Sequence, residues 1–225
     1  MLEHLSWLPP ESVTPAGLDG KSIDARGADW SGLSLGSLDL SSANLCRADL
    51  RGTDLHLCQL DSIDIRLARY DSNTIFPPDF DFQSSGAVGP GAKLNGAFLN
   101  AADLRGMDLR GANLMGAYIS GADLSGAILD GVSLVGSDLR SAVFRGAMCR
   151  QTRFGNAQLD QADFRGADLS GASLETVESI KGADFSFTQG LDGLRSVLLA
   201  RPAEELDCWN PLTRSTTRLS LESLS

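Results

Sequence analysis

A period of five residues constrains the fold of this chain more than any other feature. From Ala92 to Thr176 the sequence divides without a gap into 17 units, which begin AKLNG, AFLNA, ADLRG and MDLRG. Of these units, 13 begin with Ala, 16 carry Leu, Ile or Phe at the third position, and 11 end with Gly. Self-similarity at a fixed period indicates stacked repeats that bury their apolar faces against one another.

An earlier run of units keeps the same rule. It spans residues 28–72, from ADWSG to ARYDS, and two degraded units, LDGKS and IDARG, precede it in phase. Neither the 3.6-residue period of a helix nor the 2.0-residue period of a strand fits this pattern. Apolar residues at positions one and three require a backbone that turns a corner once per unit, and a closing Gly relieves the steric cost of that corner.

These units resemble the pentapeptide-repeat family, whose consensus is A(D/N)LxG, over roughly 150 residues of the chain. The resemblance implies an all-β solenoid, a right-handed quadrilateral β-helix with four units per coil. The first and third residues would point inward, and equivalent side chains of successive coils would stack in columns. The stretches YDSNTIFPPDFD, AVGPGAKLNGAFLNAADL and ELDCWNPLTRSTTR further resemble a recurring cyanobacterial group, which implies a photosynthetic bacterial source.

Breaks in the five-residue phase predict five parts. An N-terminal cap segment covers 1–17, a first pentapeptide-repeat array 18–72, and a second array 92–176. An irregular loop rich in phenylalanine, proline and glycine covers 73–91, between the arrays. Residues 177–225 form a C-terminal cap helix and tail.

The C-terminal part carries the signal of an amphipathic helix over residues 191–200. Its apolar face would consist of Leu191, Leu194, Val197 and Leu198. Such a helix would cover the core and strand edges of the last coil. Two interpretations of the remaining tail are open: it folds back along the coils, or it docks onto a second copy and forms a homodimer. The opposite end would be covered by Leu2, Leu5, Trp7 and Leu8.

Residues that usually carry catalysis or bind metals are sparse. His4 and His56 are the only histidines, and no cysteine stands near them at ligand spacing. Cys58 and Cys149 fall at inward positions and are interpreted as core residues, whereas Cys46 faces outward. The aspartates that recur at position two are interpreted as structural ladders rather than paired catalytic carboxylates. No Walker loop, Rossmann fingerprint or GxSxG sequence occurs, so we predict no enzyme activity, no cofactor and no metal site.

Apolar residues at outward positions remain as candidates for a functional surface. Phe98 and Tyr118 stack at the second position of one face. Met115 and Val135 stack at the fourth position of the preceding face, beside the same corner. The four side chains predict a ridge that binds a protein partner, unless the 73–91 loop or the C-terminal tail covers it.

The 73–91 loop supplies three further candidate partner-binding residues, Phe76, Phe80 and Phe82. This apolar content is unlike that of a flexible linker. The rings either pack the loop against the solenoid wall, which is the favoured interpretation, or belong to a projecting recognition loop.

The net charge of −10 is diffuse, because the second array carries nine acids against eight bases. Solubility is the simplest explanation. On the face with Asp103, Asp123 and Asp163, arginines alternate with the aspartates and cancel their field. This balance disfavours nucleic-acid binding. It also disfavours the alternative function, a DNA mimic that interacts with topoisomerase and protects gyrase, which is a known role in the wider family.

The leading prediction is therefore a non-enzymatic protein-binding or scaffolding module with a protein partner. No apolar run approaches the length of a membrane span. The first residues lack the features of a secretion signal, and the four cysteines are too few for a disulfide framework. These observations predict a cytoplasmic location.

Overall fold

The computed structural model describes residues 23–224, which form two compact units. The first unit ends at Val88 and the second begins at Gly89. The predicted N-terminal cap segment, 1–17, and residues 18–22 of the first array lie outside the described residues. Helices and extended strands are short, and in chain order they are η3 (Phe82–Ser84), α1 (Arg195–Leu199), α2 (Ala203–Leu206), β1 (Trp209–Asn210), β2 (Ser215–Thr216) and α3 (Thr217–Glu222).

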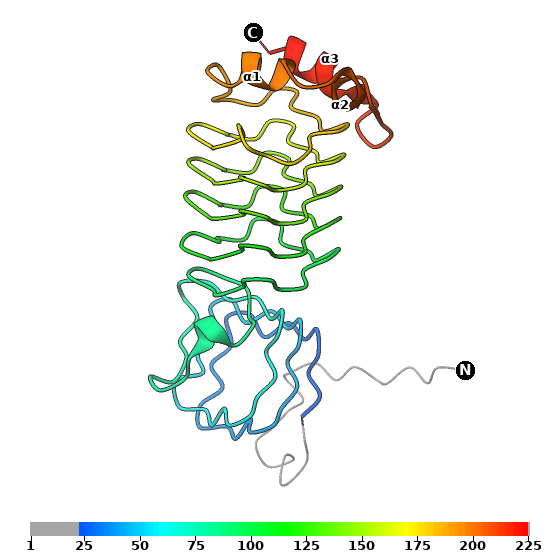
Figure 1. Ribbon diagram of the computed structural model, residues 1–225. Coiled ribbons are helices and arrows are strands. Elements are labelled where there is room, and N and C mark those ends of the chain that lie inside the picture. The colour runs from blue at the N-terminus through cyan, green and yellow to red at the C-terminus, as the bar shows by residue number, and fades with distance from the viewer. Residues whose placement is uncertain (1–22, 225) are drawn as a thin grey trace, which may run out of the picture. The chain divides into compact units, whose positions relative to one another are not determined.

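The second unit is a pile of 20-residue coils. Parallel bridges join each position-two residue to its equivalent 20 residues later, from Lys93↔Asn113 to Arg153↔Ser173. Figure 1 shows these coils lying one on another. Their backbones are joined by hydrogen bonds: the Leu104 N–H donates to the Asp123 carbonyl (2.8 Å). Four five-residue units therefore make one coil, as the family resemblance implied.

Central residues of the units fill the interior of this pile. Leu114 and Leu134 are fully buried, and so are most of the alanines at position one. Phe144, Phe164 and Phe185 stack in one column, with ring centroids 4.6 and 5.3 Å apart. Because each apolar side chain lies on its equivalent in the next coil, the core is continuous through the unit.

Corners between units need a left-handed backbone at position five. Gly121 has a φ of 67°, which costs glycine nothing. Ser141 and Gln161 occupy the same corner in the next two coils with a φ of 58° each. The corner therefore accepts residues other than glycine at a steric cost.

The first unit is built in the same way but is less regular at its end. Its bridges keep a 20-residue spacing from Asp24↔Asn44 to Asp49↔Arg69. The last two are Asp54↔Ile75 and Arg69↔Val88, with spacings of 21 and 19 residues. Parts of the irregular segment at 73–91 thus pair with the coil before it.

The regular coils of the second unit continue beyond residue 176, although with a changed spacing. Gln158↔Ser179 and Asp168↔Gln189 are each 21 residues apart, so one residue is inserted after Ser173. Arg201 stabilises this insertion, since its guanidinium donates to the carbonyls of Val177 (3.2 Å) and Glu178 (2.9 Å). The five-part division drawn from the sequence stays a prediction.

Side chains of the C-terminal segment satisfy the open backbone groups of the last coil. The Ser220 hydroxyl accepts from the Phe185 N–H (3.1 Å), and the Thr217 hydroxyl donates to the Ile180 carbonyl (3.1 Å). Asn210 is buried and donates to the carbonyls of Gln161 and Gly182. Because backbone groups at the end of a β-structure would otherwise be unpaired or open to another chain, these contacts close the pile.

The predicted helix over 191–200 is shorter than its pattern indicated. Only Arg195–Leu199 is helical, and Leu191 belongs to the turn before it. Leu191 and Leu198 are buried, as predicted, but Val197 is exposed, so the expected apolar face is wrong at this position. Gly193 disfavours helix through the first part of the segment.

A charge in the core should unfold the second unit. Leu114→Asp places a carboxylate at a fully buried position, and we expect it to lower the free energy of unfolding by about 4 kcal/mol or more. Leu114→Met, which nearly conserves volume, should cost less than about 1.5 kcal/mol. Urea denaturation followed by circular dichroism measures both, and equal stability of Leu114→Asp and the parent would contradict the assigned core.

Candidate functional site

The predicted pair of exposed aromatic rings lies on the outer surface of the second unit. Phe98 and Tyr118 are joined by a backbone bridge between neighbouring coils, and their rings stack with centroids 4.8 Å apart and planes 7° apart. Despite this contact, Phe98 is 73% exposed and Tyr118 is 45% exposed. The ladder therefore holds two large apolar side chains in fixed positions at the surface.

Met115 and Val135 extend this pair across the corner. Both occupy position four of the preceding face, in successive coils. Met115 is 42% exposed and Val135 is half-buried. We name Phe98, Met115, Tyr118 and Val135 the aromatic ridge, and their role in binding stays a prediction.

Phe98 and Tyr118 lack the polar contact that many units have at position two. In the unit with Asp103, the carboxylate accepts from the N–H of Arg105 (3.2 Å), two residues later. A phenyl or phenol ring cannot replace this acceptor, because its carbon atoms accept no conventional hydrogen bond. Phe98 and Tyr118 thus give up a local stabilising contact and expose apolar surface, which fits a role outside folding.

The C-terminal tail does not cover the aromatic ridge. Its anchor, Asn210, binds the carbonyls of Gln161 and Gly182, two and three coils beyond the coil of Tyr118. The 73–91 loop, which was the other proposed cover, belongs largely to the first unit.

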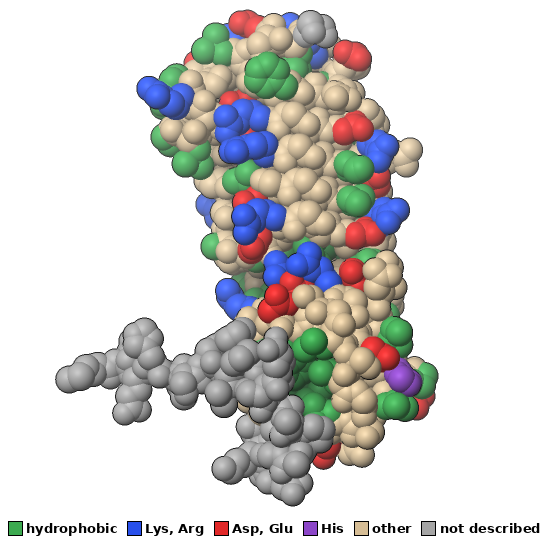
Figure 2. All heavy atoms as spheres, turned by 180° about the vertical axis from the view of Figure 1, so that it is seen from behind, with side chains coloured by type: hydrophobic (Ala, Val, Ile, Leu, Met, Phe, Trp, Pro, Cys, Tyr) green, Lys and Arg blue, Asp and Glu red, His purple; other side chains and the backbone are tan. Residues whose placement is uncertain are grey.

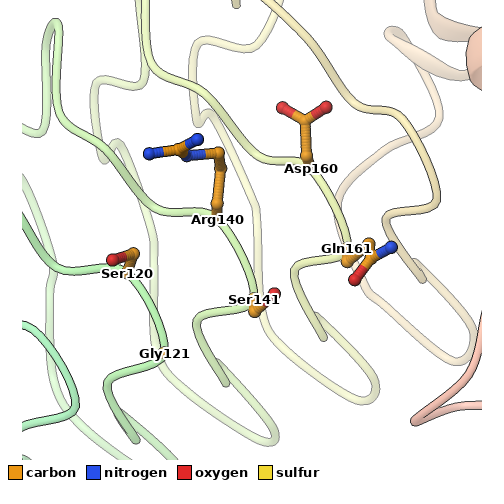
Figure 3. Close-up of a pocket in the computed structure, with 6 residues that line it drawn as sticks. All are labelled: Ser120, Gly121, Arg140, Ser141, Asp160 and Gln161. Carbon is orange, nitrogen blue, oxygen red and sulfur yellow. The ribbon is translucent and has the colours of Figure 1, made fainter.

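A shallow depression of about 450 Å³ is lined by Ser120 and Gly121, which belong to the unit of Tyr118 and the corner after it, and by Arg140, Ser141, Asp160 and Gln161 of the next two coils. Figure 3 shows Ser120, Arg140 and Asp160 at its rim, on successive coils. Arg140 forms an ion pair with Asp138 (2.7 Å), and Asp160 accepts from the Ser179 hydroxyl (3.0 Å). Both charged groups therefore already have partners, and the depression offers polar contacts rather than a catalytic pair.

The phenylalanines of the 73–91 loop pack mainly on one another. Phe76 and Phe82 stack at 4.8 Å, and both meet the ring of buried Tyr70 edge-on, at 5.8 and 5.3 Å. Phe76, Phe80 and Phe82 are all half-buried. These contacts favour the packing interpretation over a projecting loop, and partner binding by the three rings stays a prediction.

Aspartates at position two repeat one ion-paired arrangement. The carboxylate commonly accepts from the N–H of position four, and in several units it also pairs with an arginine side chain there. Among residues 23–224, the seven Asp–Arg ion pairs within one unit are 24/26, 49/51, 64/66, 103/105, 108/110, 138/140 and 163/165. Figure 2 shows the result on one face, where red and blue side chains lie together and neither forms an unbroken stripe. The aspartates are thus structural, and their charge is largely neutralised locally.

Asp163 is the most deeply buried of these carboxylates, with 3% of its surface exposed. Burial alone would raise its pKa, but hydrogen bonds from Arg165 and Arg145 hold the pKa below its usual value. The Arg165 and Arg145 guanidiniums lie 2.7 and 3.3 Å from its Oδ2. The carboxylate is therefore stabilised in its charged form by two coils at once.

Cys58, Cys149 and His56 have surroundings that are typical of structural residues. Cys58 and Cys149 are buried, and burial raises the pKa of both thiols, which disfavours the reactive thiolate. His56 pairs with Asp54 in its own unit (2.6 Å). Within residues 23–224, no group of three or more His, Cys, Asp or Glu side chains is arranged to hold a metal ion. No helix in that range is long and apolar enough to cross a membrane.

Several exposed apolar residues near the C-terminal end were missed by sequence reasoning. They are Phe187, Trp209, Leu212 and Leu219, which are between 54% and 80% exposed. Of these four residues, only Phe187 could have been identified from the sequence. It stands at position five, where the corresponding units of earlier coils have Gly.

Loss of the Asp163 charge should weaken both stability and its dependence on pH. Because its folded pKa is lowered, the carboxylate contributes stability above the unfolded pKa of about 3.9, and this is lost as pH falls through the folded value. Asp163→Asn should cost about 1–3 kcal/mol at pH 7. It should also flatten the fall in unfolding free energy below about pH 4. Urea titrations across pH test this, with exposed Glu175→Gln as the control; an equally steep fall in Asp163→Asn would contradict the role of Asp163.

The repeats of this chain match a known protein family. A family model described as "Pentapeptide repeats" matches eight copies over residues 23–56, 31–66, 91–120, 117–148 and 144–177. No curated protein matches the chain.

Solved structures with a similar repeat include proteins from cyanobacteria and plants. HetL from Nostoc sp. strain PCC 7120, a pentapeptide repeat protein involved in heterocyst differentiation regulation, is 24% identical; the match covers 72% of this chain and 88% of HetL, with a TM-score of 0.28. A pentapeptide repeat protein from the Arabidopsis thaliana thylakoid lumen is 27% identical over 59% of this chain and 89% of its own, with a TM-score of 0.32. Rfr23 from the cyanobacterium Cyanothece 51142 is 18% identical over 73% and 89%, with a TM-score of 0.27. Since the family model matches more than half of the sequence and the coils carry its units in register, the chain belongs to the pentapeptide-repeat family.

Proposed function

We propose that this chain is a non-enzymatic protein-binding module that engages a protein partner through the aromatic ridge. The observation that carries the proposal is the stacked Phe98–Tyr118 pair, which is held in register by the ladder and is nevertheless largely exposed. Exposed aromatic residues in fixed positions are typical anchors of protein interfaces.

Rigidity of the coils supports this proposal. The bridge between Phe98 and Tyr118 and the contact between their rings limit the side-chain freedom that binding would remove. Binding therefore requires little ordering of this surface. Ser120, Arg140 and Asp160 of the depression would supply the polar contacts that surround an apolar anchor in such interfaces.

The detailed form of the solenoid is part of the proposal. We infer a right-handed quadrilateral β-helix in both units, which agrees with 20-residue coils and a bridged residue at position two of each unit. A cytoplasmic location and a homodimer through the C-terminal segment stay predictions.

The alternative function, a DNA mimic that protects gyrase, is disfavoured by the ion pairs. A mimic of the phosphate backbone needs uncompensated negative charge along a face. Here Arg105, Arg145 and Arg165 pair with aspartates of their own or the neighbouring coil. These contacts neutralise the negative electrostatic field of the aspartates in the second array, where the repeat is most regular.

Removal of the two rings should abolish partner binding while the fold remains. Phe98→Ser combined with Tyr118→Ser removes side chains that lie outside the core, with the loss of one stacking contact between them, so its Tm should stay close to that of the parent. We expect at least about tenfold weaker binding. The measurement is affinity capture from native cells with mass spectrometry, followed by calorimetry with the purified partner.

Val197→Ser is the matched control, because Val197 is similarly exposed but lies in α1, far from Phe98 along the coils. It should bind the partner as the parent does. A partner that binds the double variant with unchanged affinity would refute the ridge as its docking site.

Charge neutralisation predicts that the chain does not compete with DNA for gyrase. In a supercoiling assay with added fluoroquinolone, a large excess of the chain should leave both supercoiling and inhibition by the drug unchanged. Protection of the enzyme at stoichiometric concentration would instead favour the DNA mimic.

A further inference from the structure

One face of the second unit lacks the aspartates that occur on the other three faces. Its first four units, which lie one coil apart, read AKLNG, ANLMG, VSLVG and TRFGN. They contain two cationic residues, Lys93 and Arg153, and no acidic residue. We name these four units the basic face. Met115 and Val135 of the aromatic ridge stand on the basic face at position four.

Arg153 is the cation of this face whose charge is available to a ligand. It is exposed, and its guanidinium makes no ion pair or hydrogen bond within residues 23–224. Position four of its own unit is Gly155, and its bridged neighbours one coil earlier and later are Ser133 and Ser173. No carboxylate therefore stands at any of these positions. Lys93, by contrast, already interacts with another group.

Ser133 shows that the fold makes little use of the polar groups beside Arg153. Its side chain is buried, and its hydroxyl has no hydrogen-bond partner in the part of the chain that the structure describes. On the neighbouring face, Asp138 at position two accepts from the N–H of Arg140 and pairs with its guanidinium. The structural role that aspartates have at position two is thus absent at Ser133 and Arg153.

The next unit on this face, ASLET, contains an acid, but the inserted residue of the last coil shifts it out of register. The Asn156 N–H donates to the Thr176 carbonyl (2.9 Å). Thr176, rather than Glu175, therefore takes the position that follows Gly155 in its column. Glu175 forms no ion pair with Arg153, so the positive charge of Arg153 is not compensated within residues 23–224.

Arg153 stands close to the aromatic ridge. Val135 lies one coil earlier and two positions further along its unit. With about 4.8 Å between coils and about 3.3 Å per residue, the two backbone positions are about 8 Å apart. In an extended peptide, two residues separated by one other residue are about 7 Å apart. One short segment can therefore place an apolar side chain on the ridge at Val135 and a second side chain at Arg153.

We propose that the partner bound by the aromatic ridge carries an acidic side chain two residues from its apolar anchor, and that this carboxylate pairs with Arg153. The inference rests on the proposed function, because the ridge supplies the apolar contact. A lysine or arginine at the same place would be repelled by Arg153 and would meet no acid on the basic face. Local charge thus selects an acidic segment, although the whole chain has a net charge of −10.

Capped tripeptides at low ionic strength test this selection. Acetyl-Trp-Ser-Glu-amide, acetyl-Trp-Ser-Gln-amide and acetyl-Trp-Ser-Lys-amide are titrated into the 15N-labelled full chain, and the amide shifts of residues 133–136 and 153–156 are followed by NMR. We expect saturable shifts with a Kd of about 1 mM for the Glu peptide. The Gln peptide should bind about twofold and the Lys peptide about three- to fivefold more weakly. The preference should disappear in about 1 M salt, which screens exposed charges.

Arg153→Gln separates the charge from the apolar contact. Because the guanidinium makes no contact that stabilises the fold, the Tm should stay close to that of the parent. All three peptides should still bind this variant, with equal affinity. Arg214→Gln is the matched control, because it removes one positive charge from the turn between β1 and β2. It should keep the preference for the Glu peptide.

Two results would overturn the pairing with Arg153 and leave the aromatic ridge in place. The first is equal or reversed affinity of the three peptides for the parent, and the second is a preference for the Glu peptide that persists in Arg153→Gln. If no peptide gives saturable shifts, the ridge itself fails as a docking site and the pairing fails with it. Unchanged binding of all three peptides by the variant with Phe98→Ser and Tyr118→Ser would have the same meaning.

Discussion

Backbone pairing between coils at a fixed interval is the constraint on which the other features of this protein depend. In the second unit, the position-two residue of each unit bridges its equivalent one coil later, as Asp103 bridges Asp123. Fixed pairing places every side chain directly over its counterpart, so each position must suit a whole column rather than a single site. Position three must therefore be apolar in coil after coil, and position one must be small, because both columns lie in a closed interior. Where position one is polar, its hydroxyl donates to the preceding coil, as Thr152 does to the Leu129 carbonyl (2.8 Å).

The same constraint explains why aspartates are abundant at position two although they serve a structural role there. At position two the carboxylate accepts from the N–H of position four, and the arginine there closes an ion pair. Stacking then brings like charges of successive coils together, which would destabilise the pile if they were unpaired. Arg145 shows how this is avoided, since it reaches Asp163 in the neighbouring coil. The abundance of Asp and Arg is thus a property of the ladder and says little about a ligand.

Much of the repeating part could be predicted from the sequence, because a column of equivalent residues leaves a five-residue period that needs no tertiary information. The period predicted that the leucines at position three are buried and that Phe98 stacks on Tyr118. The structure confirms both predictions. The ends could not be predicted so well, because they obey no period. Residues in α1 illustrate this: Val197 fits an amphipathic pattern over 191–200, yet it is exposed, and only Arg195–Leu199 is helical. The hydrogen bonds of Arg201 and Asn210 with distant carbonyls likewise depend on how the chain folds back.

Residues that differ from the other members of their column are therefore the most informative about function. They differ from one another in what the fold explains. Cys149 departs from the apolar Leu, Ile or Phe of position three but remains buried, so the fold accounts for it. Phe98 replaces an aspartate whose contact with the backbone it cannot make, and Phe187 replaces a glycine whose backbone angle it cannot adopt without strain. In both cases the substitution removes a local stabilising feature and adds exposed apolar surface. Stacking on Tyr118 recovers part of this stability for Phe98, but both rings remain mostly exposed, so folding alone gives little reason for their presence.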